Sequence, residues 1–297
     1  MRCLLFLSLL TSLLGAAPHP HQKSILEAGK RIDSVTSGVH GTFAIAFKDL
    51  RTGTTLYRNA GRSFVAASTI KTAVMIEVYR QARRGRLSLR DSLPVVNRFT
   101  SIVDRSPFSL DRTADTDDSL YARIGQKEEV GKLVVEMITL SSNLAADLLT
   151  DRVRPAAIRR TMSGLGLKEI RVLRGVEDMK AYEAGRNNTV TARALARLFE
   201  LLAEKKVIGK RESNAMLGIL ESQRLNDMIP ALLPRTVRIA HKTGSSAGVE
   251  HDGGIILLPD GREYVLVVLS SGLADPRSGK DAIAAISRIL YDYEVAE

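Results

Sequence analysis

The sequence predicts an α/β fold of the α+β type, with one antiparallel sheet built from both ends of the chain and helices inserted between them. Strand patterns occur at residues 42–58 and again from residue 236 onward. Between these regions the apolar residues recur mostly at helical spacing, and residues 279–292 close the chain as a helix. This order predicts two lobes: an α/β lobe of residues 18–62 and 215–297, and a helical lobe of residues 63–214.

The first strand pattern is the segment TFAIAF, residues 42–47. Its alternation places Phe43, Ile45 and Phe47 on one face of a strand. The turn sequence DLRTG follows, and then a second short run, TTLYR. Together these segments predict an N-terminal β-hairpin.

The middle of the chain combines helical segments with two long connections. Apolar side chains keep the helical period over residues 130–138 and 195–202. Residues 94–126 form a polar stretch without a clear period, and residues 171–190 form a second connection. Loops this long in a compact domain are usually functional or disordered, so both are candidates for shaping a binding pocket.

Three apolar runs of strand length follow late in the chain. They read TVRIAHKTG, GGIILL and EYVLVVLSS, and they begin at residues 236, 253 and 263. The last two are joined by PDGR, which is typical of a hairpin turn. We expect these runs to complete the sheet that the N-terminal hairpin begins.

The first 17 residues have the composition of a secretory signal. Arg2 supplies a positive charge, an apolar run extends from Leu4 to Leu14, and small residues end at Ala17. No later segment has the length of a membrane span. The sequence therefore predicts cleavage near Ala17 and a secreted or periplasmic protein without an integral membrane segment.

Composition excludes several classes of site. Cys3, the only cysteine, lies in the expected signal, so no disulfide, thiol chemistry or cysteine metal site remains after processing. The five histidines lack metal-binding spacing, and neither a metal nor another cofactor is expected. The net charge is +10, or +9 without Arg2, and the charges are dispersed without interleaved aromatic residues. Nucleic acid is therefore not an expected partner, and we expect a monomer.

Lys71 lies in an environment that is unusual for a lysine. The segment SFVAASTIKTAVMIEVYR, residues 63–80, is apolar almost all round beyond Ala73, which predicts a buried helix. An ammonium group is rarely buried for packing alone. Ser68 lies three residues earlier, on the same helix face, so Lys71 could accept the proton of a nucleophilic serine. Alternatively, Ser68 caps the helix and Lys71 extends to water.

Two further polar groups lie beside apolar segments. Ser141 and Asn143 form S-x-N directly before a helical pattern, where simple helix capping is the alternative interpretation. Residues 242–244 read K-T-G at the end of an apolar strand, and Ser245 follows them. The alternative there is a strand that ends in a polar turn.

Taken together, S-x-x-K, S-x-N and K-T-G resemble the signature of serine β-lactamases and penicillin-binding proteins. The chain is similar to the class A serine β-lactamase family over nearly its whole mature length. Ser141 and Lys242 are 101 residues apart, close to that family's interval, and SSNLAADLL and HKTGSS match beyond the motifs. The resemblance implies a β-lactamase/transpeptidase-like fold, with an antiparallel sheet of about five strands flanked by helices, plus an all-α lobe.

The resemblance also implies an acyl-transfer site. Ser68 would attack a β-lactam or D-alanyl carbonyl, Lys71 would help to remove its proton, and Ser141 would pass a proton to the leaving nitrogen. Backbone N–H groups of Ser68 and Ser245 would form the oxyanion hole. Asn143 would hold the substrate's side-chain amide. The residues implied around the substrate carboxylate are Lys242, Thr243, Gly244 and Ser245.

The part of that family's machinery that hydrolyses the acyl-enzyme is altered. Class A enzymes carry an E-x-x-L-N stretch, whereas the corresponding region reads LRGVEDMKAYEAGRNN and lacks it. Glu177 is the nearest carboxylate and lies beside Asp178, although strict spacing from Arg174 places Val176 at the family's glutamate position. Glu177 is therefore either a catalytic residue or an exposed loop acid.

Other departures accompany this one. Ser142 stands where the family usually has aspartate, and His251 and Asp252 stand where many members carry an arginine for the substrate carboxylate. Ser68 and Ser141 are 73 residues apart, longer than the family's usual interval. The acylation residues are thus intact, while the deacylation residues are not evident.

Three functions remain open. The first is a secreted β-lactamase that hydrolyses the β-lactam amide through a Ser68 acyl-enzyme and confers antibiotic resistance. The second is a peptidase or transpeptidase-like enzyme that acts on peptidoglycan stem peptides, an alternative motivated by the missing E-x-x-L-N stretch. The third is a non-catalytic sensor or binding domain that is acylated once.

Overall fold

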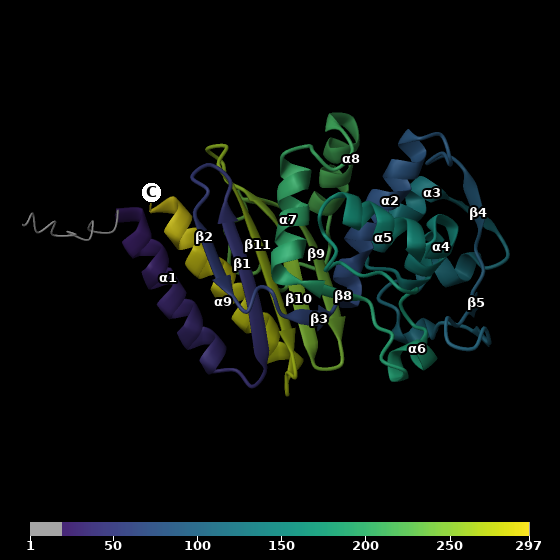
Figure 1. Cartoon of the computed structure of the whole chain (residues 1–297), viewed down its shortest axis with the longest axis horizontal. Coiled ribbons are helices and arrows are strands. Elements are labelled where there is room, and N and C mark those ends of the chain that lie inside the picture. Colours follow the sequence, from purple (N-terminus) through teal and green to yellow (C-terminus); the bar gives the residue numbers. More distant parts are fainter. Residues whose placement is uncertain (1–19, 297) are drawn as a thin grey trace, which may run out of the picture.

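The computed structural model describes residues 20–296, so the expected signal, residues 1–17, lies outside the described residues. The described chain forms a five-stranded antiparallel sheet in the order β2-β1-β11-β10-β9, flanked by helices (Figure 1). This confirms the predicted α+β fold and the expected size of the sheet. The strands are β1 (Thr42–Asp49), β2 (Thr55–Arg58), β9 (Arg238–Ser246), β10 (Val249–Leu257) and β11 (Glu263–Ser271).

The two ends of the chain meet at the centre of this sheet. β1 pairs with β11 over its whole length, from Thr42 opposite Ser271 to Asp49 opposite Tyr264. β10 and β11 are joined by the tight turn that PDGR predicts, in which Gly261 has a φ of +88°. β10 and β11, the last two strands in the sequence, therefore lie between the N-terminal hairpin and the edge strand β9.

Alternation along β1 divides the hydrophobic core into two layers. Phe43, Ile45 and Phe47 are buried on the face covered by α1 (Pro20–Ser37) and α9 (Pro276–Val295). Their neighbours Ala44 and Ala46 are equally buried on the opposite face, against the helical region. Because both faces are covered, β1 is apolar on both faces and its buried residues form a continuous run.

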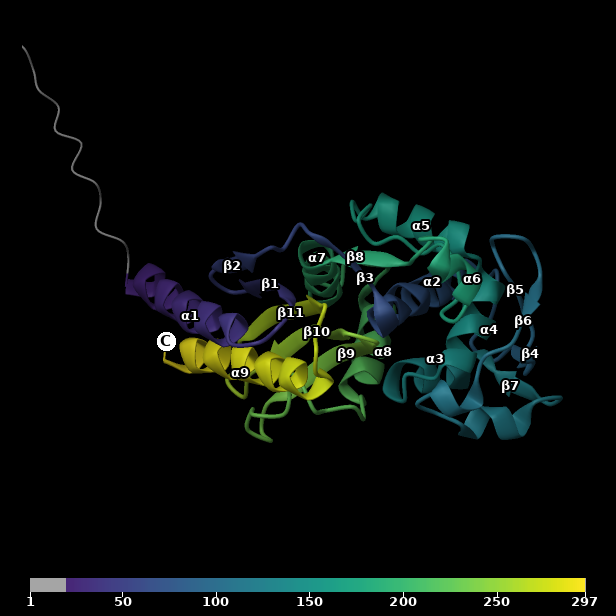
Figure 2. The same ribbon diagram turned by 90° about the horizontal axis from the view of Figure 1, so that it is seen from below.

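The helices that cover the sheet come from distant parts of the chain. α1 and α9 lie side by side across one face, as Figures 1 and 2 show. α7 (Ala192–Ala203) packs against β1, β10 and β11 on the other face. Residues 192–203 were expected within the helical lobe, yet they form part of the sheet's own cover. The sequence pattern assigned no element to α1.

The remaining helices gather beyond the edge strand, at the opposite end of the molecule from α1 (Figure 1). α2, whose residues from Lys71 to Tyr79 are all buried, runs through the middle of this group. The helices are η1 (Ala67–Ile70, a 3-10 turn), α2 (Lys71–Arg83), α3 (Val130–Thr139), α4 (Asn143–Val153), α5 (Pro155–Gly164), α6 (Met179–Glu183) and α8 (Lys210–Glu221).

The two long connections contain short regular elements. Within or beside residues 94–126 lie β4 (Ser92–Pro94), β5 (Phe99–Thr100), β6 (Pro107–Phe108), η2 (Arg112–Ala114), η3 (Ser119–Arg123) and β7 (Lys127–Glu129). The second connection carries α6 and then β8 (Thr189–Thr191), which pairs with β3 (Ser63–Val65) directly before η1. This pairing ties the second connection to the segment that carries Ser68.

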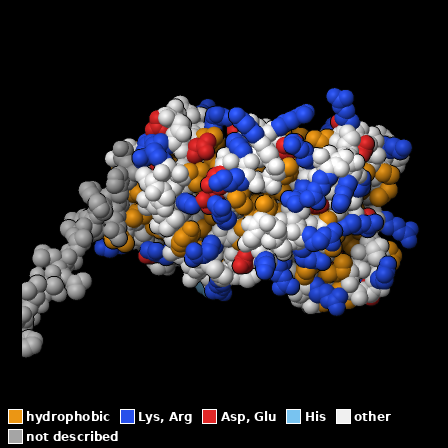
Figure 3. All heavy atoms as spheres, turned by 45° about the horizontal axis from the view of Figure 1, so that its top comes forward, with side chains coloured by type: hydrophobic (Ala, Val, Ile, Leu, Met, Phe, Trp, Pro, Cys, Tyr) orange, Lys and Arg blue, Asp and Glu red, His pale blue; other side chains and the backbone are white. Residues whose placement is uncertain are grey.

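The surface is basic, but its positive and negative charges are intermixed. Lys and Arg side chains are spread over the face drawn in Figure 3, with Asp and Glu among them. In the part of the chain that the structure describes, no helix combines the length and the apolar character that crossing a membrane requires.

Candidate active site

Ser68 lies in η1, the turn that leads directly into α2. Neither η1 nor α2 has a side-chain hydrogen bond at its N-cap, so Ser68 does not cap the helix. Ala67, directly before it, has a φ of +43°, a left-handed conformation that is costly for a residue other than glycine. Ser68 lines a cavity of about 570 Å³, and no hydrogen bond among the described residues occupies its hydroxyl.

Lys71 is completely buried, so it does not extend to water. Its Nζ donates hydrogen bonds to the carbonyl oxygen of Ser141 at 2.5 Å, to the Ser141 hydroxyl at 3.2 Å, and to Asn143 Oδ1 at 2.7 Å. Ser141 has a φ of +59°, and in this conformation its carbonyl and its hydroxyl both face the same ammonium group. The strained backbone thus serves the contact with Lys71.

Burial also sets the proton affinity of Lys71. Removal from water lowers the pKa of its ammonium group to about 8, and the surrounding carboxylates oppose this shift. An amine whose pKa lies near neutrality can both accept and return a proton. The carboxylates that act on it are Asp115, Asp147 and Glu177.

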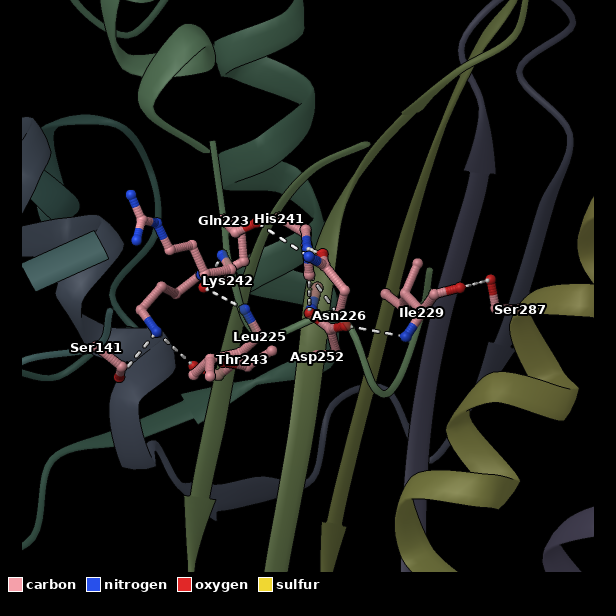
Figure 4. Close-up of polar contacts among 12 residues, drawn as sticks. Ser141, Gln223, Leu225, Asn226, Ile229, His241, Lys242, Thr243, Asp252 and Ser287 are labelled. Atoms are coloured by element: carbon pink, nitrogen blue, oxygen red, sulfur yellow. Dashed lines mark hydrogen bonds and ion pairs between the residues drawn. The ribbon is translucent and has the colours of Figure 1, made fainter. Parts of the chain in front are cut away.

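The Ser141 hydroxyl lies between two buried lysines. Lys242 Nζ donates to Ser141 Oγ at 3.0 Å and to the carbonyl oxygen of Thr243 at 3.0 Å, as Figure 4 shows. Burial lowers the pKa of Lys242 well below its ordinary value, and the nearby charge of Lys71 lowers it further. Ser141 is therefore placed to pass a proton from either lysine to a group in the cavity.

The polar residues at the start of α4 have separate tasks. Ser142 is the N-cap and accepts from the Ala145 backbone N–H, so the capping interpretation holds for this serine. Asn143 faces the cavity, where its Nδ2 donates to Glu177 Oε1 at 2.6 Å while its Oδ1 accepts from Lys71. Asn143 thus joins Lys71 to Glu177 through a single amide.

Glu177 lines the same cavity as Ser68 and is not an exposed loop acid. Its second oxygen, Oε2, accepts from the Asp111 backbone N–H at 3.3 Å. Burial raises the pKa of its carboxyl group. Asp178, its neighbour, points away and accepts from Ser101 and from backbone N–H groups. Of the two acids, only Glu177 reaches the site.

The backbone around Glu177 is held by a buried carboxylate of α4. Asp147 Oδ1 accepts from the Val176 backbone N–H at 2.6 Å, and burial raises the pKa of Asp147 to about 7. Gly175 passes so close that a Cβ there would lie 2.5 Å from the Asp147 oxygens. Asn188 fixes the other end of the segment by accepting from the backbone N–H groups of Leu173 and Arg174.

The edge strand β9 brings K-T-G against Ser68. A Cβ on Gly244 would lie 3.0 Å from the backbone nitrogens of Ser68 and Thr69, so only glycine permits this approach. β9 and β10 are joined by a two-residue turn closed by the pair Ser246 and Val249. Because bonded and non-bonded pairs alternate, the Ser245 N–H points toward the free edge and the cavity. The backbone geometry therefore suits an oxyanion hole.

His251 and Asp252 do not face the substrate position. His251 is buried; its Nε2 donates to the Val65 carbonyl at 2.8 Å and its Nδ1 accepts from the Ser270 N–H at 3.0 Å. Burial lowers the pKa of His251, in keeping with this neutral tautomer. Asp252 accepts from His241 Nδ1 at 2.9 Å and from a backbone N–H of the loop before β9 (Figure 4). Both residues support the sheet.

Two acids that contribute to the site were not singled out from the sequence. Asp115 accepts from the backbone N–H groups of Asn143 and Leu144 and from the Tyr121 hydroxyl, and so anchors the start of α4. Asp115 lies in a polar stretch, where nothing in the sequence distinguishes it from the other acidic residues. Asp147 is different, because it interrupts an apolar helical run just as Lys71 does, and the same reasoning would have found it.

The sequence of nearly the whole chain matches a known protein family. The model of the beta-lactamase enzyme family matches residues 27–294. This chain belongs to that family. The matched region takes in every residue that lines the cavity, from Val65 to Ala247.

Individual relatives are distant but match along nearly their whole length. The extended-spectrum beta-lactamase PER-1 of Pseudomonas aeruginosa is 26% identical, over 90% of this chain and 87% of that relative. A beta-lactamase of Bacteroides uniformis is 26% identical, over 97% of this chain and 98% of that protein. Two solved structures, a beta-lactamase from Sphaerobacter thermophilus and PBP-A, are each 25% identical to this chain and have a TM-score of 0.78. Each match covers 91% of this chain; it covers 97% of the Sphaerobacter protein and 96% of PBP-A. The fold is thus that of β-lactamases and penicillin-binding proteins.

Proposed function

We propose that this member of the family is a class A-type serine β-lactamase that forms and then hydrolyses a Ser68 acyl-enzyme. Family and fold already establish a β-lactamase-like serine hydrolase. The observation that carries the finer proposal is the chain of contacts from Lys71 through Asn143 to Glu177. It lies beside the Ser68 hydroxyl, which has no hydrogen bond among the described residues. It provides one proton acceptor for each half of the reaction.

In the acylation step, Ser68 Oγ forms a bond to the β-lactam carbonyl carbon and its proton passes to Lys71. Backbone N–H groups of Ser68 and Ser245 stabilise the oxyanion, a contribution of about a hundredfold or more per donor. The C–N bond then breaks, and the nitrogen receives the Ser141 proton. Ser141 regains a proton from Lys71, which contacts its hydroxyl and so returns to the neutral amine.

In the deacylation step, a water molecule attacks the ester carbonyl and gives its proton to Glu177. The C–O bond to Ser68 breaks, and the proton that Glu177 took from the water returns to Ser68 Oγ, so that Ser68, Lys71 and Glu177 end in their starting protonation states. The raised pKa of the Glu177 carboxyl group supports this role, because a base works best when its pKa approaches the working pH.

The alternative is a peptidase or transpeptidase-like enzyme that acts on peptidoglycan stem peptides. The absence of E-x-x-L-N and the likeness to PBP-A favour it. The two functions share the acylation step and differ in how fast a β-lactam ester at Ser68 is hydrolysed. For either function we propose a monomer that is exported by its signal segment, and for the first a role in antibiotic resistance.

The decisive experiment is pre-steady-state hydrolysis of a chromogenic cephalosporin. Wild type is expected to turn over many equivalents, and Ser68→Ala to turn over none. Glu177→Gln is expected to give a burst of one equivalent and then to slow by about 10²–10⁴-fold. Glu183→Gln is the matched control, because Glu183 is an exposed acid of the same connection.

One outcome would favour the peptidase over the β-lactamase. If wild type itself stops after one equivalent, β-lactam hydrolysis is not its activity. Release of D-alanine from a stem-peptide mimic, and its loss in Ser68→Ala, would then establish the peptidase.

A further inference from the structure

A carboxylate stands behind Ser245, at the place where a substrate carboxylate is expected. Ser245 and Glu250 are directly opposite each other in β9 and β10. They form a non-bonded pair, the arrangement in which opposed side chains lie closest. Ser245 Oγ donates to Glu250 Oε2 at 2.5 Å. Ser245 is exposed and lines the cavity, whereas Glu250 is 3% exposed and lies beneath it.

No cation neutralises Glu250 within the described chain. The ion pairs of residues 25–296 include none to this carboxylate, although Lys280 of α9 and Asp227 of the loop before β9 both act on its charge. Lys280 is instead bound to Asp227 at 2.7 Å. Burial raises the pKa of Glu250, as expected for an acid without an ion-pair partner.

The hydrogen bond to Glu250 fixes what Ser245 can offer a substrate. A hydroxyl group has one proton and two lone pairs, and a carboxylate can only accept hydrogen bonds. While the proton of Ser245 is given to Glu250, its side chain presents only lone pairs to the cavity. A substrate carboxylate at this position would meet an acceptor with a second carboxylate behind it.

We propose that Glu250 is a positioning residue that makes the Ser245 hydroxyl a hydrogen-bond acceptor, and not a donor, toward the cavity. The subsite at Ser245 then prefers an uncharged group with an N–H or O–H, such as an amide or a hydroxyl, over a carboxylate. This inference rests on the proposed acyl-transfer function and changes one expectation drawn from the sequence. Of the residues expected around a substrate carboxylate, Ser245 would select against it.

The test compares a penicillin with its primary amide, in which the carboxylate is replaced by a neutral donor. The quantity is the ratio of kcat/KM for the acid to kcat/KM for the amide, or of the second-order rates of Ser68 acylation if turnover is absent. Glu250→Ala releases the Ser245 proton and is expected to raise this ratio by about tenfold or more, mainly through KM for the acid. Adding Ser245→Ala to Glu250→Ala is expected to remove the gain.

Two further variants keep the test informative. Glu250→Gln preserves the size of the side chain and removes its charge, so it is expected to raise the ratio several-fold even if Glu250→Ala folds poorly. Asp227→Asn removes a neighbouring charge without touching Ser245 and is expected to leave the ratio within about twofold. A change as large as that of Glu250→Gln would mean that general charge, and not the Ser245 proton, controls the preference.

The pH dependence supplies an independent readout. In wild type the ratio is expected to rise as the pH falls and Glu250 becomes protonated, because Ser245 can then donate to the substrate. In Glu250→Ala the ratio is expected to stay flat. An unchanged ratio in both Glu250 variants, with Ser68 acylated by both compounds, overturns the inference; acylation by neither compound would instead contradict the proposed function.

Discussion

The proposed acylation centre and the Glu177 segment line one cavity but are built in different ways. Ser68 and Lys71 lie at the start of α2, Ser141 and Asn143 at the start of α4, and the K-T-G residues on β9. Glu177 lies in irregular backbone between Leu173 and α6. Its position depends on side chains of other elements that bind the backbone on either side of it.

This difference explains why one half of the site has a recognisable pattern and the other does not. In a helix or strand, the spacing of two side chains fixes their geometry. In an irregular segment, the number of residues can change while the anchoring hydrogen bonds keep a carboxylate in place. Strict spacing therefore points to Val176, whose side chain lines the cavity wall, although the acid that contacts Asn143 is Glu177.

The largest expected effect isolates the acylation centre. Lys71→Met replaces the buried amine with an apolar chain of similar length, and it should lower the second-order rate of Ser68 acylation by about 10²–10⁴-fold. Mass spectrometry of the β-lactam adduct measures this rate. Lys132→Met, at an exposed lysine of α3, is the control and should leave the rate unchanged. Equal rates in the two variants would remove Lys71 from the mechanism.

The pH dependence of acylation tests the same group without mutation. Since the pKa of Lys71 lies at about 8, the neutral amine is scarce at pH 6 and prevails at pH 9. If Lys71 is the base, the acylation rate should rise by about a hundredfold between these pH values and level off above pH 8. A rate that is flat over this range would show that Lys71 acts only by its position or its charge.

A substitution with a smaller expected effect should slow deacylation, which depends on the Glu177 segment, more than acylation. Asp147→Ala leaves the Val176 N–H without its acceptor, and should slow deacylation by about tenfold while changing acylation much less. The acyl-enzyme would then accumulate in the steady state, where mass spectrometry detects it. Asp147→Asn keeps an acceptor oxygen and should retain most of the deacylation rate. Equal losses in both variants would mean that the charge of Asp147, and not its hydrogen bond, matters.

Much of the fold follows from local sequence patterns. The alternation in β1, the apolar runs of β10 and β11 and the closing helix all lie where the sequence predicts them, because buried strands and helices have distinct periods. α1 was missed, although Ile25, Ala28 and Ile32 repeat at helical spacing and are buried. Polar and charged residues separate these positions, so the helical period is weak in the sequence.

The candidate site was predictable where its chemistry is unusual for its surroundings. Lys71 stands out because burying an ammonium group is costly, so a lysine in an apolar helix indicates a function. The inward position of Glu177 and the bond between Ser245 and Glu250 were not predictable. Each depends on which distant backbone or side chain lies opposite, and in an irregular segment or a hairpin of unknown register the sequence does not specify that neighbour.

The smallest expected effect tests how tightly the Glu177 segment is packed. Gly175→Ala places a methyl group where the Asp147 carboxylate lies, at 2.5 Å from both oxygens, so either the segment or the carboxylate must move. We expect a loss of about 1–3 kcal/mol in the free energy of unfolding, measured by urea denaturation. Deacylation should slow modestly, and acylation should stay near its wild-type rate.

The control for this variant is Gly164→Ala, at the end of α5, where an added methyl group meets no atom within 4 Å. In a helix alanine is more favourable than glycine, so this substitution should be neutral or slightly stabilising. If Gly175→Ala were equally harmless, the segment could move aside without cost, and contact with Asp147 would not be what holds Glu177. If Gly175→Ala impairs deacylation selectively, close packing against α4 substitutes for the regular structure that fixes the acylation centre.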